Sequence, residues 1–228
     1  MKIPKSVRIA CFLGSMGLAL GYGAPAQAGL VYTFDQNGGG FAGSGPWGTV
    51  TLAQAGANTV DVRAELASGV GIINSNGFDR FTFNLDGNPA LAAGNFNFVT
   101  AGFSFDPTTT LPIHMDGSGY WEYGLLCTNA VCGNGGNAPF AGPLEFKVSL
   151  AGLTESSFVS TTDSKGNYFA ADVCEKFPLA TAPGCAAKTG VVWTAGPPVH
   201  QEVPEPGSLA LLGIAALALA RIRRTGKN

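Results

Sequence analysis

Charged side chains are scarce in this sequence, and basic ones are scarcest between its two ends. Only 12% of the 228 residues are charged, about half the usual share. Of the 13 Lys and Arg residues, three lie in the first eight positions and four in the last eight, so six remain between them; 13 of the 15 acidic residues lie before position 202. An acidic domain is repelled by phosphate backbones, so this balance argues against nucleic acid as a partner.

Histidine and the common catalytic signatures are also lacking. The chain has two histidines, and His114 is the one that lies outside the C-terminal segment. Nucleophilic catalysis of the Ser-His-Asp type needs a nucleophile near such a histidine, and no G-x-S-x-G is present. No phosphate-binding glycine loop follows a strand and opens a helix. We therefore interpret His114, beside Asp116 and a glycine-rich turn, as an ordinary surface residue.

Paired carboxylates are the remaining catalytic possibility. Glycoside hydrolysis needs two carboxyl groups that face each other across a cleft. Asp116, Glu122 and Asp172 are candidates, but no pattern in the sequence pairs them. We predict a protein that is not an enzyme; a secreted glycan hydrolase that uses Asp116 or Glu122 is the minor alternative.

The N-terminal 28 residues have the three parts of a secretory signal. A basic segment to Arg8 precedes an apolar stretch of about twelve residues, Ile9–Leu20, and the small residues Ala26 and Ala28 follow. This pattern predicts a signal peptide over 1–28 that signal peptidase cleaves after Ala28. The alternative is a permanent anchor, for which the apolar stretch is short of the roughly 20 residues that span a bilayer.

A second apolar stretch lies at the other end. Leu209–Ala220 contains no charged residue, and the basic cluster Arg221, Arg223 and Arg224 follows it. Twelve helical residues rise only about 18 Å against roughly 30 Å of hydrocarbon. We predict a marginal transmembrane helix at about 207–222, with the basic cluster in the cytoplasm and the bulk of the protein outside. A buried core helix is the alternative.

The residues before that helix carry a family resemblance. Val203, Pro204, Glu205 and Pro206, then the apolar helix, then arginines at the chain end, resemble the PEP-CTERM sorting domain over about residues 202–226. The resemblance implies export by a bacterium that makes exopolysaccharide. It also implies an exosortase as processing enzyme, a membrane-embedded enzyme similar to cysteine peptidases that removes the tail. We assign 203–228 to this tail and 196–202 to a Pro-rich stalk.

The pattern of the region between the signals, 29–195, predicts short strands separated by turns. Val60–Leu66 and Leu144–Leu150 alternate apolar and polar residues with a period of two, and no stretch shows a convincing helical period. The other expected strands are Leu30–Phe34, Thr49–Leu52, Phe81–Leu85, Phe96–Thr100, Gly102–Phe105, Tyr120–Leu125, Ser157–Val159, Tyr168–Val173 and Val191–Thr194. We predict an all-β fold, an antiparallel, jelly-roll-like β-sandwich in which each sheet has one wet and one dry face. An N-terminal signal helix and a C-terminal transmembrane helix flank it.

Four cysteines remain after the signal peptide is removed. An even number in an oxidising compartment indicates disulfides. Of three possible connectivities we favour Cys127–Cys132 with Cys174–Cys185, because each pair brackets a loop that contains Gly or Pro. A four-cysteine zinc site is the rival, although its spacings do not match two tight knuckles.

Aromatic side chains suggest sugar binding as a further possible function. Tyr120, Trp121 and Tyr123 form the cluster best placed to stack on sugar rings; the alternative is that these rings fill the sandwich core. We expect no cofactor, except that Asp86, Asn88 and turn carbonyls could hold a structural Ca²⁺ ion.

The part from Gly119 to Ala171 also resembles the body of a recurring group of PEP-CTERM proteins. Its segments EYGLLCTNAVCGNGG, GPLEFKVSLAGLTESSFV and NYFAADVC carry that resemblance, which implies no activity. We therefore expect an exported, non-catalytic protein of the cell surface or the exopolysaccharide matrix, with an extracellular carbohydrate-binding module as the alternative.

Overall fold

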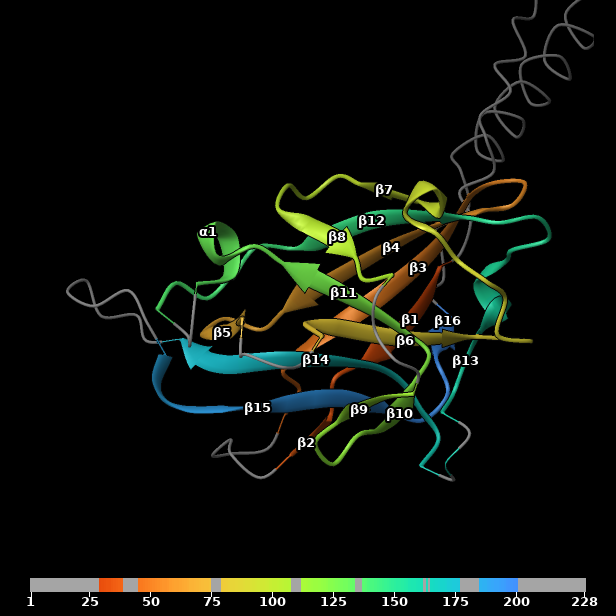
Figure 1. Ribbon diagram of the computed structural model, residues 1–228. Helices are drawn as coiled ribbons and strands as arrows, with labels where there is room; N and C mark the ends of the chain where they lie inside the picture. The colour runs from red at the N-terminus through yellow and green to blue at the C-terminus, as the bar shows by residue number, and fades with distance from the viewer. Residues whose placement is uncertain are drawn as a thin grey trace, which may run out of the picture. The chain divides into compact units, whose positions relative to one another are not determined.

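The computed structural model describes residues 29–38, 45–74, 79–107, 112–133, 137–161, 163, 165–176 and 185–200, all within one unit, Gln27–Pro204. Strands dominate this part, which confirms the all-β prediction (Figure 1). The strands are β1 (Leu30–Thr33), β2 (Gln36–Asn37), β3 (Gly48–Gly56), β4 (Thr59–Leu66), β5 (Val70–Ile72), β6 (Phe81–Leu85), β7 (Phe96–Phe98), β8 (Phe103–Phe105), β9 (Ile113–Met115), β10 (Gly119–Trp121), β11 (Tyr123–Cys127), β12 (Leu144–Ser149), β13 (Phe158–Val159), β14 (Asn167–Lys176), β15 (Cys185–Ala195) and β16 (Val199–His200). The helical elements are η1 (Ala93–Asn95), α1 (Asn129–Cys132) and η2 (Glu155–Ser157).

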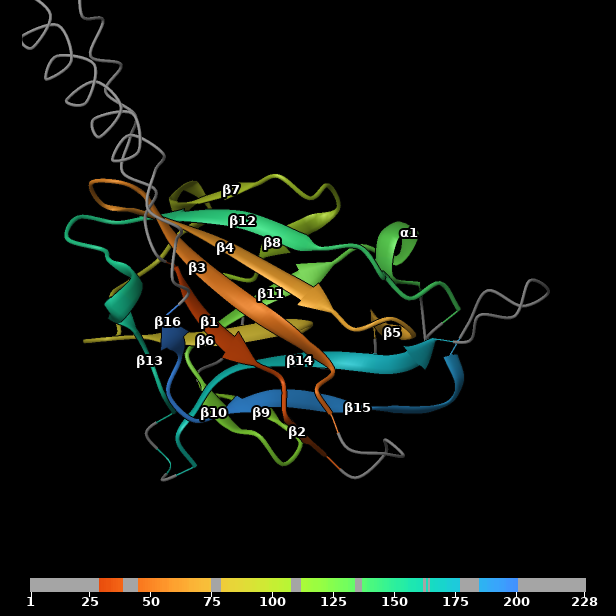
Figure 2. The same ribbon diagram turned by 180° about the vertical axis from the view of Figure 1, so that it is seen from behind.

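Two antiparallel sheets carry most of these strands. A six-stranded sheet has the order β16-β1-β3-β4-β12-β7, and an eight-stranded sheet has the order β2-β15-β14-β6-β11-β8, with β13 on β6 and β5 on β14. Figure 1 looks onto the eight-stranded sheet, and Figure 2 onto the six-stranded one. Successive strands pass repeatedly from one sheet to the other, so both sheets contribute to one apolar core.

The six-stranded sheet has the expected wet and dry faces. In β4, Val60 and Val62 are buried while Asp61 and Arg63 lie on the outer face, and β12 alternates in the same way. Across the pair, Lys147 Nζ lies 2.6 Å from the Asp61 carboxylate, and Arg63 bridges to acidic residues on both strands. These partly exposed ion pairs contribute little stability, about 0.2–1 kcal/mol each, so the buried apolar side chains hold the sheet in place.

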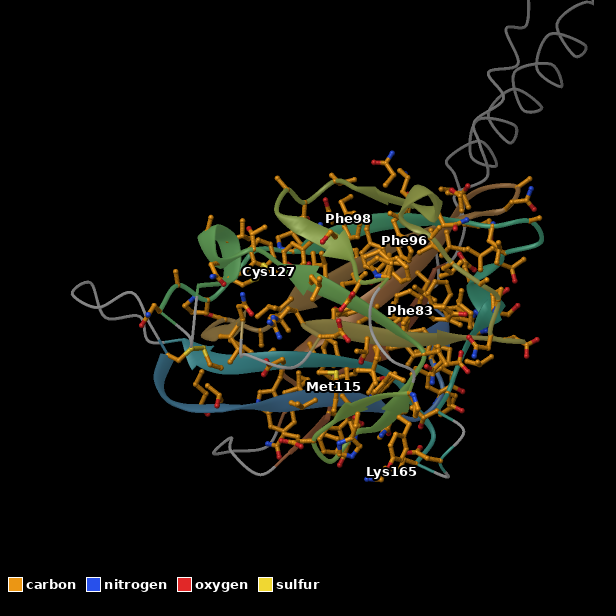
Figure 3. The ribbon with its side chains drawn as sticks, viewed as in Figure 1. Phe83, Phe96, Phe98, Met115, Cys127 and Lys165 are labelled. Atoms are coloured by element: carbon orange, nitrogen blue, oxygen red, sulfur yellow. A yellow bond between two sulfur atoms is a disulfide. The ribbon has the colours of Figure 1, made fainter. Side chains whose placement is uncertain are left out.

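Aromatic rings fill the space between the sheets. Phe83 of β6 is fully buried, and its ring centroid lies 5.3 to 6.4 Å from those of Phe96, Tyr123, Phe146 and Phe158 (Figure 3). These rings come from both sheets and from β13. Offset and edge-on ring pairs of this kind add about 0.5–1.5 kcal/mol each beyond their burial, so this cluster fixes how the sheets face each other.

The eight-stranded sheet differs from the prediction, because part of its outer face is also covered. The hairpin β9–β10 turns Ile113, Met115 and Trp121 toward the sheet, where they form a second small core with Ala170 and Val191. Met115 lies against this face in Figure 3. The expectation of one wet face per sheet is therefore wrong here: the hairpin forms a third layer over β14 and β15.

The hairpin also divides one expected strand in two. The predicted strand Tyr120–Leu125 is β10 and β11, separated at Glu122, where the chain passes from the hairpin into the eight-stranded sheet. The backbone N–H of Glu122 donates to Asn84 Oδ1 at 2.7 Å. This bond to a buried β6 side chain holds the crossing point in place.

Both disulfides have the connectivity favoured from the sequence. Cys127 is bonded to Cys132 across α1, and Cys174 to Cys185 between β14 and β15. The four-cysteine zinc site is thereby excluded, because a disulfide sulfur is not a thiolate ligand. In the loop model of disulfide stabilisation, short loops of this size contribute about 2–3 kcal/mol each.

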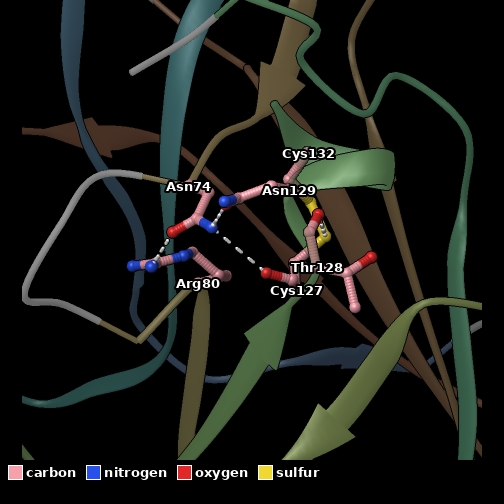
Figure 4. Close-up of a disulfide and its surroundings, with 6 residues drawn as sticks. All are labelled: Asn74, Arg80, Cys127, Thr128, Asn129 and Cys132. Atoms are coloured by element: carbon pink, nitrogen blue, oxygen red, sulfur yellow. Dashed lines mark hydrogen bonds between the residues drawn. A yellow bond between two sulfur atoms is a disulfide. The ribbon is translucent and has the colours of Figure 1, made fainter. Parts of the chain in front are cut away.

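An amide network ties the first disulfide to the sheet. Asn74 donates to the Cys127 carbonyl at 3.3 Å and to the Asn129 side chain, and it accepts a hydrogen bond from Arg80 (Figure 4). Arg80 is almost completely buried, and burial lowers its pKa despite the nearby carboxylate of Asp172. The short helical turn α1 is therefore anchored to β6 as well as to β11.

The expected stalk 196–202 is partly a strand. Val199 and His200 form β16, which pairs with Val31 and Leu30 of β1 at the edge of the six-stranded sheet. The stalk prediction is wrong for these two residues, since backbone pairing holds them on the domain. The signal helix and the transmembrane helix expected at the two ends lie outside the described residues. Within the described part, no helix is long and apolar enough to cross a bilayer.

Candidate functional site

The three aromatic residues expected to bind sugar have three different environments. Trp121 is fully buried in the small core under the hairpin, and its indole N–H donates to Ser118 Oγ at 3.1 Å. A sugar ring has no access to this side chain. The glycan-stacking prediction is wrong for Trp121, because the hairpin adds an apolar layer in which alternate residues point inward.

Tyr123 is also a core residue. Its ring stacks on Phe83 with centroids 5.3 Å apart, and its hydroxyl donates to Asn88 Oδ1 at 2.9 Å and to the Pro89 carbonyl at 2.6 Å. Burial, together with the nearby charge of Glu122, raises the pKa of Tyr123. The stacking prediction is wrong for this residue too, since its ring lies in the apolar core to which both sheets contribute.

Tyr120 is the member of the cluster that solvent can reach. It is 49% exposed, and across one rung of the hairpin it faces His114, with ring centroids 5.1 Å apart. Successive hairpin residues alternate in direction, so Tyr120 and His114 point outward while their neighbours point toward the sheet. The two rings form a small aromatic surface. Sequence reasoning considered Tyr120 a candidate for sugar stacking and His114 an ordinary surface residue, and it did not predict that the two rings lie together.

Charged side chains border this aromatic surface. The backbone N–H of Tyr120 donates to Asp163 Oδ2 at 3.2 Å, and Lys165 Nζ donates to the Gly117 carbonyl at 2.8 Å. Lys165 is labelled at the foot of the hairpin in Figure 3. We call Tyr120, His114, Asp163 and Lys165 the hairpin platform.

A glycine makes the platform possible. Gly119 has φ +116°, and a Cβ atom there would meet the carboxylate of Asp163. A side chain at this position would be strained by the backbone and would also displace Asp163. Gly119 thus allows the loop after β13 to approach β10. The turn at 116–118 is the sequence signal for the platform, because a hairpin centred on Gly117 places residue 114 opposite residue 120.

The three carboxylates considered for hydrolysis do not face one another. Asp116 is exposed in the hairpin turn, Glu122 lies beyond the other end of β10, and Asp172 is buried in β14 beside Arg80. Paired acid and base chemistry needs both groups within one substrate's reach. The structure thus places these residues at separate positions and assembles no such pair from them.

Glu122 lies instead in a pocket at the edge of the eight-stranded sheet. This cavity has a volume of about 300 Å³, and we call it the edge pocket. Its polar lining comes from Asn88, Asp106, Glu122 and Tyr123, and its apolar lining comes mainly from prolines, Leu91 and Phe105. Sequence reasoning missed Asp106, since its proximity to Glu122 depends on the pairing of β8 with β11.

The carboxyl group of Glu122 has an unusual setting. Burial raises its pKa, and a hydrogen bond from the Leu85 backbone N–H opposes that shift. Its Oε2 atom is enclosed and has no hydrogen-bond partner. Buried polar atoms are nearly always hydrogen-bonded, so this oxygen is a candidate contact for a ligand.

A larger open groove, of about 720 Å³, lies where the described chain ends. Gln54, Asn58, Glu155 and His200 are among the residues that line it. The backbone N–H of Gln54 donates to Glu155 Oε1 at 2.6 Å, so this carboxylate is already engaged. The groove is open, its lining mixes polar and apolar residues, and it presents no Phe, Tyr or Trp ring among its described lining residues.

Metal ligation finds little support within the residues that the structure describes. They include no group of three or more His, Cys, Asp or Glu side chains that could hold an ion. Of the two residues considered for calcium, Asp86 is exposed in a turn, and Asn88 Oδ1 accepts the Tyr123 hydroxyl. Calcium at this turn stays a prediction.

The processing residues expected from the sequence lie outside the described ranges. They are the signal-peptidase positions Ala26 and Ala28, the motif Val203–Pro206, and the basic cluster at 221–224.

Comparison with known proteins identifies the C-terminal segment. Residues 202–224 match the family model of the PEP-CTERM protein-sorting motif, and the match includes Pro204–Pro206 and the arginines that follow the apolar stretch. No curated protein and no solved structure matches the chain.

Proposed function

We propose that this protein, which its PEP-CTERM motif marks as exported and processed by an exosortase, is a non-catalytic component of the cell surface or of an exopolysaccharide matrix. The motif at 202–224 is the observation that carries this proposal, because it points to export and to an exosortase as processing enzyme. The folded domain has the acidic, weakly charged character that suits contact with hydrated polymers.

The described part of the domain supports a role without catalysis. His114 faces a tyrosine ring, not a nucleophile, and the carboxylates expected to act in hydrolysis are in separate places. The four mature cysteines are bonded in pairs, so they offer no thiolate.

A second, more specific function is favoured by the hairpin platform. We propose that the domain binds matrix polysaccharide there. Tyr120 offers an exposed ring on which the apolar face of a sugar can pack. Asp163 and Lys165 lie beside it and can exchange hydrogen bonds with hydroxyl groups. An aromatic surface with a polar rim is a common arrangement of binding sites.

Affinity electrophoresis of the purified protein through gels that contain the producer's own polysaccharide tests this function. We expect the polysaccharide to retard the wild-type protein, and Tyr120→Ala to abolish most of the retardation. Val99→Ala is the matched control, because Val99 is also an exposed apolar residue and lies on the other sheet, next to β7. Equal retardation of Tyr120→Ala and wild type would exclude the platform. Absence of retardation in all three would exclude polysaccharide binding.

A further inference from the structure

The edge pocket lies where two strands bring carboxylates together. β8 is an edge strand of the eight-stranded sheet, and it pairs with β11 so that Phe105 faces Leu125. The Asp106 N–H continues this ladder by donating to the Gly124 carbonyl at 3.0 Å. Asp106 therefore lies opposite Gly124, and Glu122, two residues earlier, is on the same face. Such diagonal neighbours are about 7–8 Å apart.

Carboxylates dominate the polar lining of the pocket, and the Asn88 amide adds an N–H donor beside them. Glu122 contributes the enclosed Oε2 atom that has no partner, and Asp106 contributes a second carboxylate. The Tyr123 hydroxyl already donates to Asn88 and Pro89, so it offers no free proton to a ligand. No Lys, Arg or His is among the lining residues that the structure describes. A ligand with donor groups suits the two carboxylates, which repel phosphates, sulfates and uronates.

The remaining walls are apolar. Pro89, Leu91, Phe105 and Pro107 surround the polar end. A cavity of about 300 Å³ is at the small end of the range for ligand pockets, roughly 300–1,000 Å³. Its size and mixed lining suit a single ring with one apolar face and donor groups at its rim. A pyranose unit has this character.

The charge of the pocket selects among sugars. A hydrogen bond between a charged donor and a carboxylate is roughly twice as strong as one between neutral groups. An ammonium group also compensates a carboxylate that burial has cut off from water, whereas a hydroxyl leaves the charge unbalanced. Of the common sugar substituents, a protonated amine therefore matches these walls best.

We infer that the edge pocket binds a sugar unit that carries a free amine, with Glu122 and Asp106 as partners of the ammonium group. The Glu122 carboxylate accepts one ammonium N–H, Asp106 accepts another, and the ring packs against the prolines and Phe105. This inference names a unit of the glycan that the proposed function calls for, and it rests on that function for the polymer from which the unit comes. The pocket is distinct from the hairpin platform in residues and location.

Calorimetric titration of the purified full chain with single sugars tests the pocket. The probes are glucosamine, N-acetylglucosamine and glucuronic acid, which differ at the group that meets the carboxylates. We expect glucosamine to bind at least tenfold more tightly than N-acetylglucosamine, and glucuronic acid to give no heat of binding. Equal affinity for the amine and its acetylated form would overturn the inference, as would binding of glucuronic acid.

Two variants locate the site. Glu122→Gln keeps the shape of the side chain and removes its charge, so glucosamine affinity should fall at least tenfold; Asp106→Asn should also weaken it. An unchanged affinity in both variants would contradict the assignment. Thermal melting shows whether each variant is folded, and the comparison of probes on the wild-type protein needs no variant.

A third variant separates this inference from the proposed function. Tyr120→Ala should keep the glucosamine affinity of the wild type while losing retardation by polysaccharide. Polysaccharide binding without glucosamine binding would overturn the edge pocket alone. Glucosamine binding without polysaccharide binding would overturn the proposed function alone.

Discussion

The indole N–H of Trp121 donates to the hydroxyl of Ser118 at 3.1 Å, and both residues are fully buried beneath the hairpin β9–β10. This bond ties the indole at the end of β10 to the last residue of the hairpin turn, and it satisfies the polar atom of a ring that otherwise contacts apolar side chains. Trp121 thus belongs to the framework that carries the platform, while its neighbour Tyr120 belongs to the exposed surface.

Replacing each of these neighbours should therefore have very unequal effects on stability. Trp121→Ala opens a cavity and removes a buried hydrogen bond, so we expect a loss of about 3–5 kcal/mol in the free energy of unfolding. Tyr120→Ala should change it by about 0.5 kcal/mol or less, as is usual for surface sites. Urea denaturation of both variants measures the difference. Similar losses for both would contradict the burial of Trp121.

Alternation along the chain explains how much of the fold could be predicted. Val60–Leu66 and Leu144–Leu150 were predicted correctly because one face of each strand meets solvent. The hairpin was missed because Ile113–Met115 is only three residues long, too short for a period to be recognised. β16 was missed because Val199 follows two prolines, which indicate an extended linker as readily as a strand edge.

The candidate sites were harder to predict for a related reason. The alternation of side chains along a strand places Tyr120 and Trp121 on opposite faces of the hairpin, but it does not say which of these faces is buried. Trp121 is buried because the hairpin packs on β14 and β15, a contact between residues far apart in sequence. That Glu122 and Asp106 line one pocket likewise depends on strand register. The disulfides were predictable because local loop composition was enough to pair the cysteines.

Glu122 should make stability fall as pH rises. Its folded-state pKa is raised above the ordinary value of 4.5 by burial, so the folded state holds the proton to higher pH than the unfolded state. Stability then declines as pH increases from about 4.5 through the raised pKa, and is constant above it. Glu122→Gln removes this contribution, so the variant should gain in melting temperature relative to wild type as pH rises from 4 to 7.

The charged groups around Glu122 do not reverse this sign. Tyr123 stays protonated over the range because its own pKa is raised, and the Asp106 carboxylate only adds to the cost of a second negative charge. Glu145→Gln is a suitable control, since Glu145 pairs with Arg63 on the outer face of the other sheet. A constant difference in melting temperature between Glu122→Gln and wild type across this range would refute the prediction.

The two disulfides should contribute unequally. Cys127 and Cys132 are five residues apart, and Cys174 and Cys185 are eleven apart. Loop-closure entropy predicts losses of about 2 and about 3 kcal/mol when each pair is replaced by serine. Denaturant midpoints of the two double variants measure this order. A larger loss for the shorter loop would show that contacts of α1, such as those of Asn129, outweigh chain entropy.

The sorting motif should be required for release. Replacing Pro204, Glu205 and Pro206 with alanine should leave the protein in the cytoplasmic membrane with its tail intact, because the exosortase no longer recognises its substrate. Fractionation and mass spectrometry of the C-terminus follow the outcome. Pro197→Ala with Pro198→Ala is the control, since it alters prolines outside the matched segment and should leave processing unchanged. Normal processing of the motif variant would exclude the motif as the recognition element.

The pairing of β1 with β16 has a consequence for how such proteins can be built. Leu30 and His200 lie on the same rung, so the domain begins and ends at one point of its surface. A fold with adjacent ends is a self-contained cassette, which can be joined to other segments on either side without disturbing its core. The sorting tail is then exchangeable, and the same domain could be carried on a different anchor or inserted into a loop of another protein.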